Sequence, residues 1–195
     1  MSGRAADTVS ALSESASVFN DLSPKAIRQL LASYPTGVAV VTTRAPDGQP
    51  IGLTINSFAS LSLDPPLVLW SLEKRSINLS SFCVCRHFAI SVLSDKQEYI
   101  ARQFANPKLP NKFADVRLQR TAEGLPSIDD ALAVLVCARE ESRIVGDHLL
   151  LIGRVVRTIN RNGKPLVFYG GRFTSIDPQD GRSESLRVRH SAVLI

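Results

Sequence analysis

Two long β-type stretches separated by only three residues constrain the fold of this chain more than any other feature. Residues 132–144 and 148–159 are rich in Val, Leu and Ile, and the segment Val145-Gly146-Asp147 between them is short enough to form a hairpin turn. Because a hairpin places its two strands side by side in opposite directions, this half of the chain is predicted to form antiparallel sheet.

The other extended segments continue the pattern. They lie at residues 37–43, 49–57, 67–72, 88–93 and 166–169. The first two flank the turn-forming segment Ala45-Pro46-Asp47-Gly48, which predicts a second hairpin. Helices are few: Ser23 and Pro24 have the character of a helix start, and residues 96–104 have helical spacing. Strands joined mainly by hairpins, without βαβ alternation, predict a mainly β fold, a closed antiparallel barrel with a few peripheral helices.

The length of 195 residues fits one domain, which we place at residues 19–176. Residues 1–18 are mostly small, polar or charged and are predicted to be a disordered leader rather than a signal peptide, and residues 177–195 are predicted to be a C-terminal extension. No apolar run approaches the roughly 20 residues that span a bilayer. The three cysteines are too few for a disulfide scaffold. We therefore expect a soluble, cytoplasmic protein that does not bind membranes.

The formal net charge of +5 is compatible with an anionic ligand or with nucleic acid. The basic residues are scattered and mixed with acids, so no nucleic-acid partner is predicted. The sequence has no GxGxxG or GxxxxGK[ST] motif, so it does not support a Rossmann dinucleotide site or a P-loop phosphate site. Nothing in it resembles a hydrolytic triad, a carboxylate pair or an HExxH helix. If the protein is an enzyme, the difficult chemistry is expected to belong to a cofactor.

The segment Cys83-Val84-Cys85-Arg86-His87 raises the question of a metal site, because on a single strand it would place two thiols and an imidazole on one face. A zinc site normally has a fourth ligand and wider ligand spacing, and the sequence has no second cluster of such residues. No metal is therefore predicted.

Hydroxyl and amide side chains crowd the segment Gly52–Ser62, at the end of a predicted strand. A planar heterocycle with carbonyls and ring nitrogens along its edge needs many short donors and acceptors, which such a segment provides. A Ser-rich loop that caps a strand has the same composition, so this interpretation stays open beside the first.

Three further groups of residues are candidates for ligand contacts. Lys74, Arg75 and Ser76 immediately precede a predicted short helix at 77–82, an arrangement that suits a phosphate, although an isolated Lys-Arg pair is more commonly a solvated charged turn. Phe104 in Arg102-Gln103-Phe104 could flank a ring or belong to the core. His148, at the turn of the long hairpin, could reach a ligand or serve a structural role.

Six segments, taken in order, resemble the flavin reductase-like family, which comprises the small reductase components of two-component flavin-dependent monooxygenases. They are PTGVAVVTT at 35–43, GLTINSFASLSLDPPLVL at 52–69, FAISVLS at 88–94, QFA at 103–105, GDH at 146–148 and PLVFYGGRF at 165–173. The resemblance covers about residues 25–175.

This resemblance implies an FMN-binding split β-barrel with Greek-key-like antiparallel strands, usually a homodimer. It implies an NAD(P)H:flavin oxidoreductase that transfers hydride from NADH or NADPH to FMN or FAD. The reduced flavin would then pass to a flavin-dependent oxygenase component. Two alternatives remain: a flavoprotein that holds its flavin tightly and reduces another acceptor, and a flavin-binding module without turnover.

The resemblance also implies roles for particular residues. The residues that match the flavin-contacting strand and loop are Thr54, Ile55, Asn56, Ser57, Ser60, Leu61 and Ser62. Lys74, Arg75 and Ser76 match the phosphate-contacting segment, and Phe104 and Ala105 match a pair near the isoalloxazine ring. His148 matches the catalytic-site histidine that holds the nicotinamide, and Tyr169, Gly171 and Phe173 match a late segment near the same pocket. Many relatives carry Tyr where this chain has Phe173, which has no hydroxyl group for such a contact.

Overall fold

The computed structural model describes residues 21–176, and its main element is a curved seven-stranded antiparallel sheet. In spatial order the strands are β3 (Pro50–Ile55), β2 (Ala39–Arg44), β6 (His87–Val92), β9 (Ala133–Val145), β10 (His148–Asn160), β5 (Pro66–Glu73) and β4 (Ala59–Leu63). The predicted mainly antiparallel β fold is confirmed. Within the described residues the ladder ends at β3 and β4, which follow each other in the chain but are not paired with each other.

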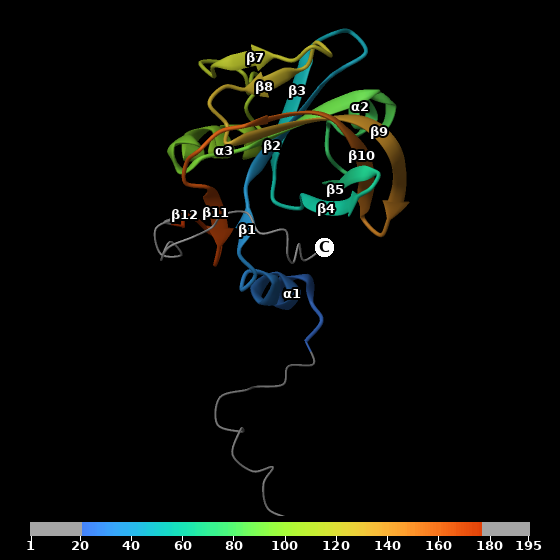
Figure 1. The fold of residues 1–195 in the computed structure, drawn as a ribbon. Coiled ribbons are helices and arrows are strands. Elements are labelled where there is room, and N and C mark those ends of the chain that lie inside the picture. The colour runs from blue at the N-terminus through green and yellow to red at the C-terminus, as the bar shows by residue number, and fades with distance from the viewer. Residues whose placement is uncertain (1–20, 177–195) are drawn as a thin grey trace, which may run out of the picture.

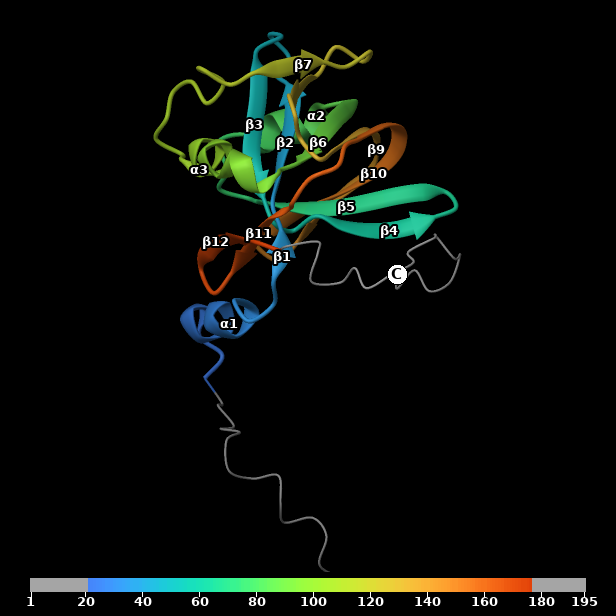
Figure 2. The ribbon, with the colours of Figure 1, turned by 60° about the vertical axis from the view of Figure 1, so that its left-hand side comes forward.

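Two small sheets and a few helices complete the described part of the chain (Figure 1). The small sheets consist of β1 (Thr36–Gly37), β11 (Leu166–Tyr169) and β12 (Arg172–Ser175), and of β7 (Leu118–Arg120) and β8 (Pro126–Ile128). The helical segments are α1 (Pro24–Leu31), α2 (Leu79–Val84), the 3₁₀ turn η1 (Asp95–Gln97) and α3 (Glu98–Ala105). Figure 2 shows α3 beside the edge strand β3, whereas β5 and β4 cross the molecule below them.

Local turn chemistry produces both predicted hairpins. Gly146 lies between β9 and β10 with φ of +60°, and His148 pairs with Val145 across the turn. Gly48 has φ of +83° between β2 and β3, where Arg44 pairs with Pro50. Glycine has no Cβ and adopts a positive φ without steric strain, so these two residues determine where the chain reverses.

The main sheet buries both of its faces, as the two hydrophobic clusters show. On β2, Val41 belongs to the cluster enclosed by the curved sheet, and its neighbour Val40 belongs to the cluster covered by α3 and β8. Helix α2 inserts Phe82 into the enclosed cluster, where its ring packs edge-on against Trp70 with centroids 4.9 Å apart. A strand covered on both faces is buried continuously rather than at alternate positions, and β2 is buried at five consecutive residues, from Ala39 to Thr43.

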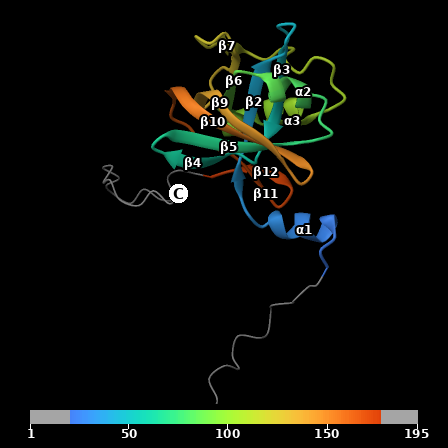
Figure 3. The same ribbon diagram turned by 90° about the vertical axis from the view of Figure 1, so that its right-hand side faces the viewer.

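Helix α1 begins as predicted, since the Ser23 side chain accepts a hydrogen bond from the Ala26 amide at 3.3 Å. None of its residues is buried, and the helix projects away from the sheets (Figure 3). No helix formed by residues 21–176 is both long enough and apolar enough to cross a membrane. The predicted leader at 1–18 and the predicted extension at 177–195 lie outside the described residues.

Two local predictions are wrong. The short helix expected at 77–82 begins at Leu79, because Ser76 and Asn78 form a turn first, with the Asn78 amide donating to Ser76 Oγ. The thiols of Cys83 and Cys85 do not share a strand face with His87: Cys83 belongs to α2, Cys85 caps that helix and His87 begins β6. Among residues 21–176, no group of three or more His, Cys, Asp or Glu side chains is arranged to hold a metal ion.

Candidate functional site

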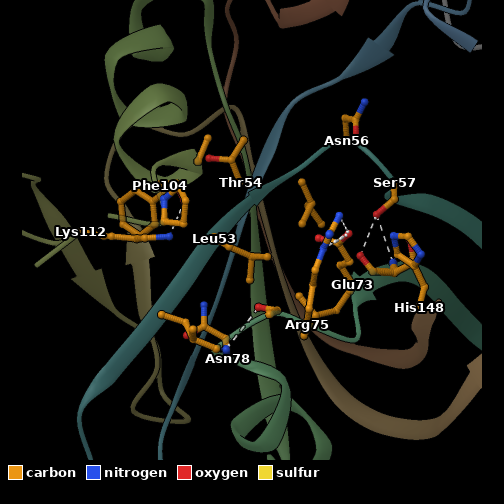
Figure 4. A pocket seen from close by; sticks show the side chains of 17 residues that line it. Leu53, Thr54, Asn56, Ser57, Glu73, Arg75, Asn78, Phe104, Lys112 and His148 are labelled. Atoms are coloured by element: carbon orange, nitrogen blue, oxygen red, sulfur yellow. Dashed lines mark hydrogen bonds and ion pairs between the residues drawn. The ribbon is translucent and has the colours of Figure 1, made fainter. Parts of the chain in front are cut away.

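A cavity of about 600 Å³ opens beside the edge strand β3 (Figure 4). One wall is β3 itself, and the others come from the end of β5, the turn before α2, the end of α3 and the start of β10. The cavity therefore collects residues that are far apart in the sequence. Nine of the predicted site residues line it: Thr54, Ile55, Asn56, Ser57, Arg75, Ser76, Phe104, Ala105 and His148.

The other predicted site residues lie elsewhere. Ser60, Leu61 and Ser62 belong to β4, the opposite edge of the sheet, because the chain ends β3 at Ile55 and starts a new strand at Ala59. Lys74 does not line the cavity, and its amide donates to the Asp147 carbonyl at 2.9 Å. The flavin contacts that the resemblance implies for Ser60, Leu61, Ser62 and Lys74 stay predictions.

The late segment lies beside the cavity rather than within it. Phe173 lines an adjoining hollow of about 180 Å³ that shares Thr54, Ile55, Asn56 and Ala105 with the main cavity. Gly171 lines a groove near α1 that shares Asn56 and Ser57 with the main cavity, and Tyr169 is 52% exposed.

The hydroxyl groups of Thr54 and Ser57, on the β3 side of the cavity, already form hydrogen bonds within the protein. Thr54 Oγ1 donates to the Ala101 carbonyl of α3 at 2.7 Å. Ser57 Oγ donates to the Ser71 carbonyl at 3.2 Å and accepts from the Ser71 amide at 3.1 Å. These bonds fasten β3 to α3 and to β5, so the hydroxyls keep acceptor capacity but have no proton left to donate.

Donors for a ligand come instead from Asn56 and from the backbone of β3. Asn56 is exposed, and its side-chain amide makes no hydrogen bond within the described part of the chain. Strand β3 is an edge of the main sheet, and an edge strand presents a row of unpaired N–H and C=O groups on its outer side. This edge can bind the donors and acceptors of a planar heterocycle.

The floor of the cavity carries an ion pair. Arg75 Nη2 lies 2.6 Å from Glu73 Oε1, and Arg75 Nε donates a hydrogen bond to the same oxygen. This hydrogen bond lowers the pKa of the Glu73 carboxyl and raises the pKa of the Arg75 guanidinium. Both groups are exposed, so an incoming anion can compete for the arginine. Ser76 Oγ accepts a hydrogen bond from the Asn78 backbone amide at 3.2 Å.

His148 lies at one end of the cavity, with its imidazole held by its neighbour. Nδ1 is 2.7 Å from Asp147 Oδ1, and this hydrogen bond lowers the pKa of the Asp147 carboxyl. With Nδ1 oriented by the carboxylate, Nε2 is the ring nitrogen that remains for a ligand. The ring is 42% exposed, so it lies at the mouth of the cavity.

The opposite end is formed by Phe104 and Lys112, as Figure 4 shows. Phe104 is fully buried, and its ring packs edge-on against Phe113 with centroids 4.9 Å apart. It approaches β3 so closely that only glycine fits opposite it, since a Cβ added to Gly52 would lie 2.6 Å from Phe104 Cε1.

Lys112 is a site residue that the sequence did not single out. Its Nζ donates to the Phe104 carbonyl at 2.9 Å, and burial lowers the pKa of its ammonium group. No carboxylate of residues 21–176 forms an ion pair with it. It lies in the polar loop after α3, where the only sequence clue was its proximity to the QFA segment.

The lining thus combines an edge of backbone groups, an apolar ring, two cations and an imidazole. No side chain in it is arranged as a nucleophile with a base, because Thr54 and Ser57 give their protons to carbonyls and Ser76 Oγ is hydrogen-bonded to a backbone amide rather than to a base. The arrangement suits a planar, anionic ligand that carries its own reactivity.

Comparisons with known proteins agree with this geometry. The flavin reductase like domain matches residues 31–177. An FMN reductase (NADH) of Agrobacterium fabrum is 44% identical over 149 residues, which cover 76% of this chain and 84% of that protein. The reductase component of a flavin-dependent trigonelline monooxygenase of Acinetobacter baylyi is 36% identical over 86% of this chain, which spans only 54% of that longer protein.

Solved structures give the same result for the fold. An NADH:FAD oxidoreductase of Streptomyces globisporus, solved with NAD and FAD fragments, superposes with a TM-score of 0.78 at 34% identity, covering 84% of this chain and 98% of that one. The predicted split-barrel fold is therefore confirmed. The domain match, the curated relatives and the superposition together show that the chain belongs to the flavin reductase-like domain family.

Proposed function

We propose that this protein binds FMN or FAD in the cavity beside β3 and catalyses the reduction of that flavin by NADH or NADPH. We further propose that the reduced flavin is passed to a separate flavin-dependent oxygenase component. The observation that carries the proposal is the cavity itself, which places an exposed strand edge, a buried aromatic wall, two cations and an oriented imidazole around one volume. Relatives named as FMN reductase (NADH) and as monooxygenase reductase components support it.

The residues of the cavity fit a flavin. The β3 edge and Asn56 would hold the polar edge of the ring, the Phe104–Ala105 wall would pack against its apolar part, and Arg75 and Lys112 would bind phosphate. When bound, the flavin supplies the hydride acceptor. The protein's part is alignment, because hydride transfer needs donor and acceptor at about 3–3.5 Å and gains much of its rate from positioning.

His148 is assigned to the nicotinamide. It lies at the cavity mouth with Nδ1–H donated to Asp147, so Nε2 of the neutral ring can accept a hydrogen bond from the carboxamide NH₂ of a pyridine nucleotide placed over the flavin ring. In this role His148 positions the donor and is not a nucleophile. The nearby Phe173 offers only its ring, which Arg102 already covers at 5.0 Å.

A homodimer is part of the proposal. Helix α1 has no buried residue, and Leu30 and Leu31 are each 65% exposed on it. Leu63 on the edge strand β4 is 62% exposed as well. Apolar side chains presented by an unpaired edge and an uncovered helix indicate a surface for a second copy.

The test is steady-state oxidation of NADH and NADPH with FMN and with FAD, followed by the loss of nucleotide absorbance. His148→Ala should raise KM for the nucleotide about tenfold, which corresponds to ~1.4 kcal/mol, and leave the Kd for flavin within about twofold. His87→Ala is the matched control, because His87 lines none of the cavities beside β3. Absence of nucleotide oxidation with either flavin would refute the proposal. Tightly held flavin with no turnover of added flavin would favour a reductase of another acceptor.

A further inference from the structure

The cavity does not end at Lys112. A second hollow of about 590 Å³ shares Ile77, Asn78 and Lys112 with the main cavity. It is otherwise lined by residues 49–52 of β3 and its turn, and by residues 109–113 of the loop after α3. We call this second volume the outer hollow.

The two volumes follow one another along the same strand. Residues 53–57 line the main cavity and residues 49–52 line the outer hollow, so together the two volumes follow the whole of β3, roughly 17 Å at ~3.3 Å per residue. Figure 4 shows His148 at one end and Lys112 at the other, with Arg75 and Asn78 between them. A cavity of about 600 Å³ is already sufficient for a ligand of ordinary size, so the outer hollow leaves room for a second part of a longer ligand.

The junction between the two volumes is cationic. Lys112 Nζ uses one of its three protons on the Phe104 carbonyl and makes no ion pair within residues 21–176. Arg75, by contrast, is paired with Glu73. A half-buried ammonium group without a carboxylate favours a strongly anionic partner such as a pyrophosphate.

The outer hollow itself has the character of a purine site. Leu109, Pro110 and the 80% exposed Ile77 offer apolar surface, and Gln49 and Asn111 add amide groups. An isoleucine side chain that is exposed at the rim of a cavity is removed from water when a flat, apolar ring covers it in the complex. This chemistry suits the adenosine half of a dinucleotide.

We propose that the outer hollow binds the adenosine 5′-phosphate half of FAD, with Lys112 against the pyrophosphate, and that the protein therefore prefers FAD to FMN. This inference rests on the proposed function, because it assigns the ring of the same flavin to the main cavity.

The test compares the Kd values of FAD and FMN, measured by flavin fluorescence. The wild-type protein should bind FAD at least about tenfold more tightly than FMN. Leu109→Asp should reduce this ratio to within about twofold, because it removes apolar contact and adds a charge that repels phosphate. Pro110→Asp, on an exposed residue of the same hollow, repeats the test if Leu109→Asp does not fold. Leu118→Asp is the control, since Leu118 is 39% exposed on β7 and lines neither volume; it should keep the wild-type ratio.

Several results would overturn the inference. Equal affinity of the wild type for FAD and FMN, or an unchanged ratio in the Leu109 and Pro110 variants, would do so while flavin reduction continued. If the Leu109 and Pro110 variants kept the wild-type ratio of Kd values for FAD and FMN but had a raised KM for NADH with FMN as the flavin, the outer hollow would be assigned to the pyridine nucleotide instead. Absence of binding of either flavin would refute the proposed function, and with it this inference.

Discussion

The Gly52→Ala substitution tests whether the packing behind β3 sets the shape of the cavity. A Cβ at this position would lie 2.6 Å from Phe104 Cε1, 3.0 Å from Phe104 Cδ1 and 3.2 Å from Phe113 Cζ. Carbon atoms pack at about 3.5–4.0 Å, so the Phe104 ring would have to move by about 1 Å. Phe104 is fully buried and packs edge-on against Phe113, so both rings must shift together.

Overpacking of this kind costs about 1–3 kcal/mol. For a domain of this size each kcal/mol lowers Tm by about 2–4 °C, so Gly52→Ala should lower Tm by about 2–12 °C. The substitution should also weaken flavin binding, because Phe104 lines the cavity and its carbonyl accepts the hydrogen bond from Lys112.

The assay is thermal unfolding followed by circular dichroism, with flavin titration on the same samples. Gly37→Ala is the matched control, since an added Cβ there has no atom within 4 Å; its Tm should stay at or slightly above the wild-type value. Phe104→Leu in the Gly52→Ala background makes room for the new methyl group, so the double variant should lose less stability than the two single losses combined. If Gly52→Ala unfolded no earlier than Gly37→Ala, the close contact with Phe104 would not limit packing, and the reasoning would be refuted.

Three further predictions concern the enclosed core. Gly153→Ala should destabilise by at least as much as Gly52→Ala without a specific effect on flavin, because its Cβ would lie 2.4 Å from Phe88 Cζ and 2.8 Å from Cys137 Cβ, away from the cavity; urea unfolding measures this. Among the three thiols, Cys83 is half-buried and should react rapidly with a disulfide reagent at mild pH, whereas Cys85 and Cys137 should react only after unfolding. Burial raises the pKa of Cys85 and raises that of Cys137 to about 12, so both thiols stay protonated in the folded protein while they ionise in the unfolded chain above its value of 9.0. The contribution of these two thiols to the free energy of unfolding should therefore be constant below about pH 9 and fall above it, by up to ~1 kcal/mol per pH unit for each thiol; no fall in stability between pH 9 and pH 11 would contradict the burial.

The parts of the fold that were predictable from the sequence are those fixed by local chemistry. Gly48 and Gly146 adopt positive φ at the two predicted turns, and Ser23 caps the first helix. The long hairpin places His148 at the start of β10, opposite Glu73 of β5, which brings the turn to the cavity. Because turns and caps depend on a few adjacent residues, they can be inferred without knowing the rest of the chain.

The parts that were missed depend on contacts between distant segments. Lys112 lies in a loop without periodicity, and Gln103 fixes its position by donating to the carbonyls of Lys112 at 3.0 Å and Ala114 at 2.8 Å. Strand β4 is not predicted by the sequence, which indicates one strand at 49–57, and it lies at the opposite edge of the sheet from β3. Nothing in the local sequence distinguishes these outcomes, because sheet order is set by pairing across the whole domain.

The position of the cavity follows from how the protein protects its exposed edge. An unpaired strand is an aggregation hazard unless something covers it, and α3 covers part of β3, tied to it by the hydrogen bond from Thr54 to Ala101. Between α3 and α2 the outer side of β3 is not covered, and this opening is the cavity. Residues 109–112 border the opening but belong to neither hydrophobic cluster. Substitutions in that loop should therefore change ligand preference at little cost in stability, which makes it the natural place for relatives to differ in the flavin they accept.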